Sequence, residues 1–429
     1  MGEYIDVLVI GAGQGGLSAS YFLTQQGVPH LVLERGEVGN AWRTNRWDSF
    51  TLVTPNWTIR LPGAEYHGNS PDAFMGREEF VAYLERWAKS FKCPLRANTE
   101  VTGLSSDGST IRVETSEGAL TTANAIIATG TYQRAKIPAI ARQCPVRLCQ
   151  LDARQYRSPD QLPDGAALVV GSGQTGCQIA DEINQAGRET YLCVGRAGRL
   201  PRRFRGRDAL EWQLDMGFLD RTPDMLDAPA DRFRGDPHVS GKNGGQTLSL
   251  HDFRAQGIHL LGRLKSISGE VAYLAKGVQD QVAYADQFAA DFRKNVDAYI
   301  VASGVVAPAP TSEELAGDPI GEDWVVPDTQ EINFLDCNIN TIVWATGFSF
   351  DFSWVNFPVI DGFGYPITKR GVTSVPGLYF VGLNWMYKKK SGIIYGVGED
   401  AEYVTSHVMD RLRTNPLEET RSMVSAQIS

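Results

Sequence analysis

The sequence of 429 residues predicts an α/β protein in which one parallel-sheet domain is inserted into another. An apolar strand-like run, a glycine turn, a helix-like segment and a second strand occur in this order twice, at 7–34 and at 168–196. A buried-type strand ending in Ala-Thr-Gly also occurs twice, at 124–130 and at 342–347. Strands that alternate with helices in this way are typical of parallel sheets.

Both glycine turns have the spacing G-x-G-x-x-G, with a strand before them and a helix after them. The glycines are Gly11, Gly13 and Gly16 in the first turn and Gly171, Gly173 and Gly176 in the second. In this pattern the first glycine permits a tight turn, the second lets the backbone approach a pyrophosphate, and the third lets helix and strand pack closely. The helix N-terminus then favours an anion. The turns therefore predict two Rossmann-like dinucleotide-binding domains, with a plain strand–helix turn as the alternative for each.

The second strands of the two units end in opposite charges. Glu34 can accept hydrogen bonds from the hydroxyls of an unphosphorylated adenosine ribose and would repel a 2′-phosphate, so the first site is predicted to bind FAD. In the second unit Gly195 is followed by Arg196, whose guanidinium can pair with a phosphate, so this site is predicted to bind NADPH. Arg196 begins a run of six arginines in 196–207, and a solvated loop is the alternative for most of them.

The order of these signals predicts the domain organisation. We expect an FAD domain made of 1–150 and 326–429, with an NADPH domain inserted at 164–325 after a polar linker. Within the first part, 77–91 has helical spacing and is followed by three short strand-like runs. The second Ala-Thr-Gly strand at 342–347 is expected to return the chain to the FAD domain. A long helix near 278–301 has no predicted place in the core.

Composition narrows the class of partner. The net charge of −9 argues against nucleic acid and anionic membranes, and no apolar run is long enough to span a bilayer. The chain enters a strand almost at once, so we expect no signal peptide and a cytoplasmic protein. The six cysteines contain no C-x-x-C pair and the six histidines have no metal-ligand spacing, so reduced thiols and no metal are expected. The sequence does not determine the oligomeric state, and a homodimer is one possibility.

The chain resembles the class B-like flavin monooxygenases, which include flavin-containing monooxygenases, plant indole-pyruvate enzymes, N-hydroxylases and Baeyer–Villiger enzymes. The segments that carry the likeness are "GAGQGG", "GNAWRTNRWDSFTLVTPNW", "GSGQTG" and "GVGEDA". "RRFRGRD", "SGKNGGQTLSLHDF" and "ATGFSFDFSW" are similar to a bacterial subgroup of flavin-dependent oxidoreductases often found beside nitrilase genes. The resemblance implies that NADPH reduces FAD, that O₂ adds at the flavin C4a, and that the hydroperoxyflavin oxygenates a small soluble substrate. N-hydroxylation is the favoured reaction.

One family fingerprint is eroded. F-x-G-x-x-x-H-x-x-x-[YF] should fall at 146–156, but Val146, Leu148 and Asp152 replace Phe, Gly and His, and only Tyr156 matches. This weakens a Baeyer–Villiger role. An NADPH-dependent reductase or oxidase that transfers no oxygen is therefore the main alternative. A disulfide reductase would need a redox-active cysteine pair, and this chain has none at the places where such enzymes carry it. A sensor that only binds flavin would not need two nucleotide sites.

The resemblance also implies which residues touch the cofactors. Asn56 would be the catalytic residue, with an amide that bonds the oxygen adduct or NADP⁺; an Asx-turn after Pro55 is the alternative. For Trp42, core packing is the alternative to a flavin contact, and for the lysines at 388–390 a solvated loop is the alternative to substrate contact. The expected cofactor-binding residues are Gly11, Gly13, Gln14, Gly16, Glu34, Arg35, Trp42, Arg43, Thr54, Val101, Thr129, Gly130, Gly171, Ser172, Gly173, Gln174, Thr175, Gly176, Arg196, Arg203, Thr346, Gly347, Gly382, Gly398 and Asp400.

Overall fold

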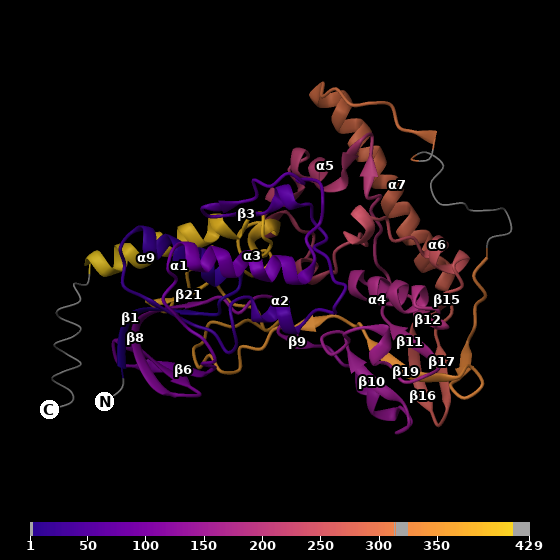
Figure 1. Ribbon diagram of the computed structural model, residues 1–429, viewed down its shortest axis with the longest axis horizontal. Coiled ribbons are helices and arrows are strands. Elements are labelled where there is room, and N and C mark those ends of the chain that lie inside the picture. The colour runs from indigo at the N-terminus through magenta and orange to yellow at the C-terminus, as the bar shows by residue number, and fades with distance from the viewer. Residues whose placement is uncertain (1–2, 313, 315–324, 415–429) are drawn as a thin grey trace.

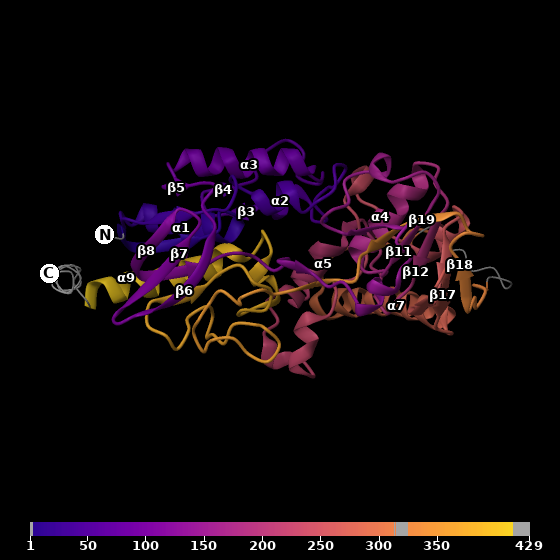
Figure 2. The same cartoon turned by 90° about the horizontal axis from the view of Figure 1, so that it is seen from below.

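The protein consists of two α/β units side by side along its long axis, as seen in the computed structural model (Figures 1 and 2). The structure describes residues 3–312, 314 and 325–414. The parts of the predicted domains at 315–324 and 415–429 lie outside these residues. In the described ranges no helix combines the length and the apolar content that crossing a bilayer would require.

The first unit is built on a seven-stranded sheet in the order β5-β2-β1-β8-β7-β6, with β21 paired to β8. The strands are β1 Glu3–Ile10, β2 Leu31–Leu33, β5 Leu95–Arg96, β6 Val101–Asp107, β7 Thr110–Thr115, β8 Gly118–Ile127 and β21 Leu378–Phe380. β5, β2, β1, β8 and β21 are mutually parallel, whereas β6, β7 and β8 form an antiparallel meander. Helices α1 (Gln14–Gln25), α3 (Arg77–Ser90) and α9 (Val397–Thr414) belong to this unit, as the helical spacing at 77–91 predicted for α3.

The second unit is built on a five-stranded, wholly parallel sheet in the order β10-β19-β11-β12-β15. Its strands are β10 Cys149–Asp152, β11 Ala166–Val170, β12 Thr190–Cys193, β15 His259–Leu261 and β19 Ile339–Trp344. A smaller antiparallel sheet contains β16 Leu264–Ser268, β17 Val271–Leu274 and β18 Glu331–Asn333. With α4 (Gln174–Gln185) following β11, this unit repeats the strand–turn–helix plan of the first. The predicted α/β class with two parallel-sheet units is confirmed.

The predicted return of the chain at the second Ala-Thr-Gly strand is wrong. β19 pairs with β11 and β10 in the second sheet, with Val343 opposite Val169, and does not join the first sheet. The chain rejoins the first sheet only at β21, whose Leu378 is opposite Ala125 of β8. An apolar parallel strand fits the interior of either sheet, so only its neighbours decide between them.

The segment with the eroded fingerprint, 146–156, contains the first strand of the second unit. Leu148 and Asp152 are 5% and 4% exposed, and 149–152 form the edge strand β10. The second sheet therefore starts just inside the predicted 1–150 segment. Two short strands, β9 (Arg134–Ala135) and β20 (Phe348–Ser349), pair antiparallel where the chain passes between the units.

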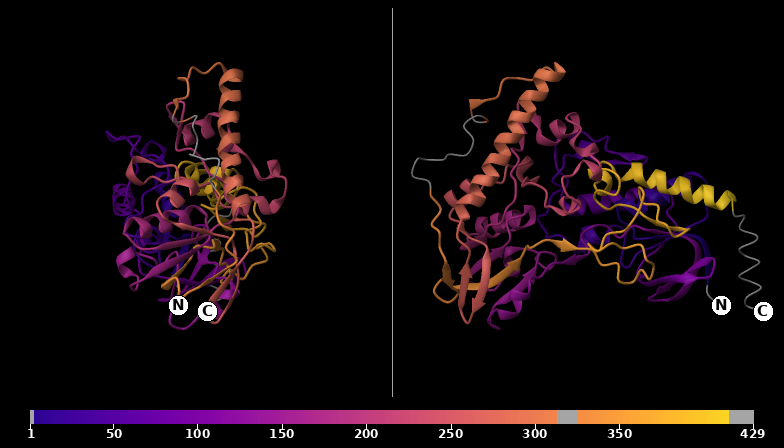
Figure 3. Two further views of the ribbon diagram at one scale, coloured as in Figure 1. Left: turned by 90° about the vertical axis from the view of Figure 1, so that its right-hand side faces the viewer. Right: turned by 180° about the vertical axis from the view of Figure 1, so that it is seen from behind.

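The helix without a predicted place is α7 (Val278–Ser303), 26 residues long. Its apolar residues Phe292 and Val296 pack with Leu200, Phe204 and Trp212 in a separate small core. Figure 3 shows its C-terminal end projecting beyond the sheets. The remaining elements are α2 Asn40–Thr44, β3 Arg60–Leu61, β4 Ala64–Glu65, β13 Arg203–Phe204, β14 Arg207–Asp208, α5 Ala209–Asp215, α6 Leu250–Ala255 and the 3₁₀ turns η1 Asn56–Thr58, η2 Ala139–Gln143, η3 Pro159–Gln161, η4 Phe218–Asp220, η5 Pro223–Met225, η6 Pro229–Phe233, η7 Lys242–Gly244 and η8 Lys389–Gly392.

Candidate functional site

The first glycine turn joins β1 to α1 and needs glycine for packing at two of its three positions. Gly11 has φ +105°, and a Cβ there would lie 2.6 Å from the carbonyl oxygen of Ala128. A Cβ at Gly16 would lie 1.8 Å from the carbonyl oxygen of Gly11. At Gly13, by contrast, nothing beyond the adjacent residues of the chain lies within 4 Å of where a Cβ would be. The middle glycine thus leaves free space at the N-terminus of α1.

The second turn, between β11 and α4, repeats this geometry closely. Gly171 has φ +106° and its Cβ would lie 2.5 Å from the carbonyl oxygen of Ala345, while a Cβ at Gly176 would lie 1.8 Å from that of Gly171. Gly173 again faces open space. Helix α4 begins with Gln174 and Thr175, just as α1 begins with Gln14. The N-terminus of each helix therefore points at the free space beside the middle glycine of its turn. Both turns have the form that can receive an anionic ligand.

The turns differ in what secures them to the second strand. In the first unit Glu34, 8% exposed, accepts a hydrogen bond from the backbone N–H of Ala12 (2.7 Å) and one from that of Gly36 (3.2 Å). In the second unit a neutral hydroxyl takes this place, because the Ser172 Oγ accepts a hydrogen bond from the Gly195 N–H (2.9 Å). A carboxylate therefore secures the first turn, whereas a serine hydroxyl secures the second.

Arg196 follows Gly195, the residue whose N–H donates to Ser172, and is exposed. Its guanidinium carbon lies 4.4 Å from the ring centroid of Tyr284 on α7, a cation–π contact that holds the side chain without neutralising it. Arg203 is also exposed and donates to the Gly244 carbonyl (2.9 Å). Among the described residues neither guanidinium is ion-paired, so both can receive an anion.

The solvated-loop interpretation fails for the other arginines of 196–207. Arg199 and Arg202 are only 4% and 3% exposed. Each of the four remaining arginines pairs with a carboxylate, in the pairs Arg199–Asp286, Arg202–Asp208, Arg205–Asp297 and Arg207–Glu211. Two of these acids, Asp286 and Asp297, lie on α7, so this helix neutralises two arginines of the run. In the described part of the chain, Arg196 and Arg203 have no acidic partner.

His238 is a residue that the sequence does not single out, because the six histidines have no metal-ligand spacing. It is 1% exposed, and its Nε2 contacts the carbonyl oxygen of Ser172 inside the second glycine turn. Its backbone N–H donates to the Gly198 carbonyl (2.7 Å). Burial lowers the pKa of His238 to about 4, so the ring is neutral near pH 7 and Nε2–H donates. His238 thereby joins the glycine turn to the arginine-bearing loop.

Around the first turn, the structure brings together three of the predicted residues, Gln14, Trp42 and Gly382. The Trp42 Nε1 donates to the Gln14 Oε1 (2.9 Å), and the Trp42 ring packs edge to face on Phe80 at 4.9 Å. Gly382 has φ +83°, and its Cβ would lie 3.5 Å from the Cα of Gly15. The N-terminus of α1 is therefore bordered by the α2 segment and by the residues after β21.

Arg43 forms an ion pair with Glu85 of α3 at 2.7 Å, and its contact with a cofactor stays a prediction. Arg46, three residues later, is not among the residues predicted from the sequence, but it lies against Trp42 beside the first turn. Its guanidinium carbon lies 5.0 to 5.5 Å from the ring centroids of Tyr132, Trp42 and Phe50. Burial lowers the pKa of Arg46, and among the described residues no carboxylate pairs with it.

Asn56 is 4% exposed and its amide is used inside the protein. Nδ2 donates to the Ser70 carbonyl (3.1 Å), and Oδ1 accepts from the Met75 N–H (3.0 Å). The Asx-turn alternative is wrong, because the Thr58 N–H donates to the Pro55 carbonyl instead. The amide holds the 70–75 loop against η1, and a catalytic contact of Asn56 stays a prediction.

The predicted residues at the start of α9 are also packed. Asp400 is 2% exposed and accepts from the Arg370 Nε (3.1 Å), while burial raises its pKa. A Cβ at Gly398 would lie 3.0 Å from the ring of Pro62. The solvated-loop interpretation fails for Lys390, which is 7% exposed and pairs with Glu399 at 2.5 Å.

The remaining predicted residues lie at the edges of the two units. Arg35 is exposed after β2, Thr54 is half-buried, and Val101 opens β6. The two Ala-Thr-Gly turns both contact the connection between the units: the Gln133 Nε2 donates to the Gly130 carbonyl (2.8 Å) and to the Thr129 Oγ1 (3.1 Å). Likewise the Thr346 Oγ1 donates to the Lys136 carbonyl, and the Lys136 N–H donates to that of Gly347 (2.9 Å).

Two glycine turns at the ends of parallel strands, one beside a carboxylate and one beside an exposed guanidinium, are the geometry of a dinucleotide-binding protein, and the comparisons identify its class as an oxidoreductase. Residues 8–203 match the pyridine nucleotide-disulphide oxidoreductase family. A CzcO-like oxidoreductase of Geobacillus kaustophilus (strain HTA426) is 32% identical over 413 residues, which cover 96% of this chain and 100% of that protein. The chain belongs to this family of CzcO-like oxidoreductases.

Two solved structures show the same fold at lower identity. A flavin-containing monooxygenase from Stenotrophomonas maltophilia superposes with a TM-score of 0.63 at 20% identity, covering 95% of this chain and 99% of that one. OTEMO, solved in complex with FAD and NADP, superposes with a TM-score of 0.57 at 18% identity, covering 97% of this chain and 87% of that one.

Proposed function

We propose that this oxidoreductase binds FAD at the first glycine turn and NADPH at the second, and oxygenates a small substrate with O₂, N-hydroxylation being favoured. The observation that carries the proposal is the contrast between Glu34 beside one turn and Arg196 beside the other. The similarity of the fold to a flavin-containing monooxygenase and to a protein solved with FAD and NADP supports it. The two domains would then be an FAD domain and an inserted NADPH domain.

The residues of the first turn fit FAD. The free space at Gly13 can receive a pyrophosphate, and the Glu34 carboxylate can exchange its backbone partner for ribose hydroxyls. When bound, FAD would supply the electron transfer and oxygen chemistry. The chain would bind and orient it through the α1 N-terminus, Gln14 and Trp42. The ring packing of Trp42 on Phe80 would help to exclude water from this side.

The residues of the second turn fit NADPH. Gly173 leaves space for a pyrophosphate, and the exposed Arg196 and Arg203 can each donate to a 2′-phosphate. His238 would keep the turn and the arginine loop in register, because it contacts both of them. In this role it is a positioning residue.

Replacing His238 by leucine is expected to weaken NADPH binding about tenfold, since one buried hydrogen bond contributes about 1.5 kcal/mol. His238→Gln keeps a donor and should retain most of the affinity. FAD binding, measured by flavin content, should be unchanged in both variants. Equal NADPH affinities of the leucine variant and the wild type, by fluorescence titration, would contradict the role.

The lowered pKa of His238 also predicts that the stability of the protein depends on pH. Its pKa in the native protein is about 4, below the usual 6.5, so between these values the unfolded chain binds more protons. The free energy of unfolding should therefore rise with pH through this window, by up to about 3 kcal/mol from this residue. Denaturant titrations of wild type and His238→Gln at pH 4.5 and pH 7 would test this, because the variant should lack that part of the change.

A flavin reductase or oxidase without oxygen transfer is the second candidate. The contacts of Asn56 favour it, because an amide already bonded to Ser70 and Met75 is less available to an oxygen adduct. Stopped-flow mixing of NADPH-reduced protein with O₂ separates the two candidates. Oxygenation predicts a transient species whose spectrum is neither that of oxidised nor of reduced FAD, followed by product. Direct return to oxidised FAD with release of peroxide, in the presence of amines, oximes and nitrile-derived compounds, would contradict oxygenation.

A further inference from the structure

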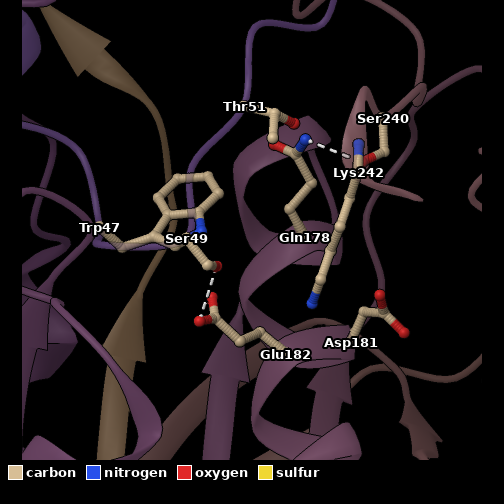
Figure 4. Close-up of a pocket in the computed structure, with 8 residues that line it drawn as sticks. All are labelled: Trp47, Ser49, Thr51, Gln178, Asp181, Glu182, Ser240 and Lys242. Atoms are coloured by element: carbon tan, nitrogen blue, oxygen red, sulfur yellow. Dashed lines mark hydrogen bonds between the residues drawn. The ribbon is translucent and has the colours of Figure 1, made fainter. Parts of the chain in front are cut away.

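Arg46 lies on a segment of the first unit that reaches the second unit. Figure 4 shows two residues just after it, Trp47 and Ser49, across from helix α4 of the second unit. The Ser49 Oγ donates a hydrogen bond to the Glu182 Oε1 on this helix (2.8 Å). Arg46 therefore lies close to the boundary between the two units.

The guanidinium of Arg46 is only partly used inside the protein. Its Nη1 donates to the Asn45 carbonyl (2.9 Å), but among the described residues neither Nε nor Nη2 has an acceptor. Asp48, the nearest acid along the chain, pairs with Arg77 instead (2.9 Å). Arg46 itself is half-buried. A half-buried charge without a partner is costly, so this side chain is suited to receive an anionic ligand.

Three aromatic rings surround this guanidinium. Its carbon lies 5.0 Å from the ring centroid of Tyr132, 5.3 Å from that of Trp42 and 5.5 Å from that of Phe50. Such contacts attract a cation and restrict its position, but they do not use its N–H groups. Tyr132 is 46% exposed and Trp42 is half-buried, so a ligand beside Arg46 can also contact ring surface.

The backbone at Arg46 is fixed by both units. The carbonyl oxygen of Arg46 accepts hydrogen bonds from the Arg77 Nη1 (3.0 Å) and the Arg157 Nη1 (2.7 Å). Arg77 begins α3 of the first unit, whereas Arg157 lies between β10 and β11 of the second. The Asp48 N–H donates in turn to the Arg157 carbonyl (2.8 Å). A segment fixed before a ligand arrives lowers the entropy that binding costs.

The rings place the guanidinium near the carboxyl ends of strands from both sheets. Tyr132 follows β8 and the first Ala-Thr-Gly turn, and it packs edge to face on Phe348 at 5.1 Å. Phe348 directly follows β19 and the second Ala-Thr-Gly turn. Trp42 bonds to Gln14, the first residue of α1. Ligands of open α/β sheets bind outside the carboxyl ends of the strands, so a group held by Arg46 would lie between the two proposed nucleotide sites.

We propose that Arg46 binds a carboxylate group of the substrate. A guanidinium matches a planar carboxylate with two parallel N–H donors, and Nε and Nη2 of Arg46 form such a pair. A phosphate is the other anion that fits these donors, but the proposed function assigns the phosphates of FAD and NADPH to the glycine turns and to Arg196 and Arg203. The inference rests on that proposed function and deepens it, because it gives the oxygenated substrate a carboxylate that lies beside aromatic rings.

Calorimetric titration of the FAD-loaded protein with benzoate and with its neutral isostere benzamide tests the proposal. The wild type should bind benzoate at least about tenfold more tightly, because only the carboxylate forms a charge-assisted pair with Arg46. Arg46→Gln should bind the two probes with constants within about twofold of each other. Arg46→Lys keeps the charge but not the paired donors, so it should keep only part of the preference. A wild type without a preference for benzoate, or an unchanged preference in Arg46→Gln, would overturn the proposal.

A control variant and the cofactors separate the possible causes of a change. Arg86→Gln is the matched control, because Arg86 is exposed on α3 with its guanidinium carbon 5.7 Å from the ring centroid of Tyr83, and it should keep the preference. FAD content and NADPH affinity should be those of the wild type in Arg46→Gln. Their loss would assign a cofactor phosphate to Arg46 and overturn the proposal. A wild type that binds no FAD would overturn the proposed function itself, whereas a missing benzoate preference at normal FAD content overturns this inference alone.

Discussion

Replacing Arg196 by glutamine is expected to raise the dissociation constant for NADPH about 30-fold while leaving that for NADH within about twofold. A charge-assisted hydrogen bond to a phosphate contributes about 2 kcal/mol, which corresponds to that ratio. Arg196 can supply it because it is exposed, is held by Tyr284, and has no acidic partner among the residues that the structure describes. Anaerobic titrations of the oxidised protein with both nucleotides, followed by flavin absorbance, would measure the two constants.

Arg112→Gln is a matched control for this variant. Arg112 is half-exposed on β7 of the first unit and pairs with Glu114, so its loss changes the net charge equally, away from the second turn. This control should bind both nucleotides as the wild type does. If Arg196→Gln and the control were indistinguishable, Arg196 would not contact the 2′-phosphate.

Alanine at two glycines of the second turn should produce opposite kinds of defect. Gly176→Ala places a Cβ 1.8 Å from the Gly171 carbonyl oxygen, and backbone cannot move aside, so we expect a loss of about 3 kcal/mol or more in the free energy of unfolding. Gly173→Ala meets no atom within 4 Å and has φ −68°, which alanine adopts freely, so its stability should change by less than about 1 kcal/mol. If the second turn binds the nucleotide as proposed, the new Cβ would occupy the space of the pyrophosphate, so NADPH affinity should fall at least about tenfold.

Denaturant titration and nucleotide titration together separate these effects. FAD content should stay at the wild-type level in Gly173→Ala, because the first turn is unchanged. Gly13→Ala is the mirror experiment, in which FAD content should fall and stability of the apoprotein should not. A Gly173→Ala protein with wild-type affinity for NADPH would show that the second turn is not the nucleotide site.

The features that the sequence predicts well are local. Each glycine turn is decided by contacts among residues close in the chain, such as Gly16 against Gly11, so the spacing alone predicts it. Glu34 and Arg196 follow their strands directly, and strand ends in a parallel sheet have a fixed place relative to the turn. The fold class and the charge contrast could therefore be predicted.

The features that the sequence does not predict depend on distant partners. β19 has the same apolar character and the same Ala-Thr-Gly ending as the first unit's strand, and only pairing with β11 decides its sheet. Arg43 and Arg46 are three residues apart, yet one reaches Glu85 of α3 and the other lies among aromatic rings. Asn56 is secured by a loop 14 to 19 residues away. No periodicity or spacing specifies such contacts.

The most direct test of the proposed division between the two turns is a comparison of NADPH and NADH as reductants of the purified wild-type protein. We predict one FAD per chain, and reduction of that FAD with a kcat/KM at least about tenfold higher for NADPH than for NADH. A protein that binds no flavin after reconstitution, or that is reduced equally well by both nucleotides, would contradict this account.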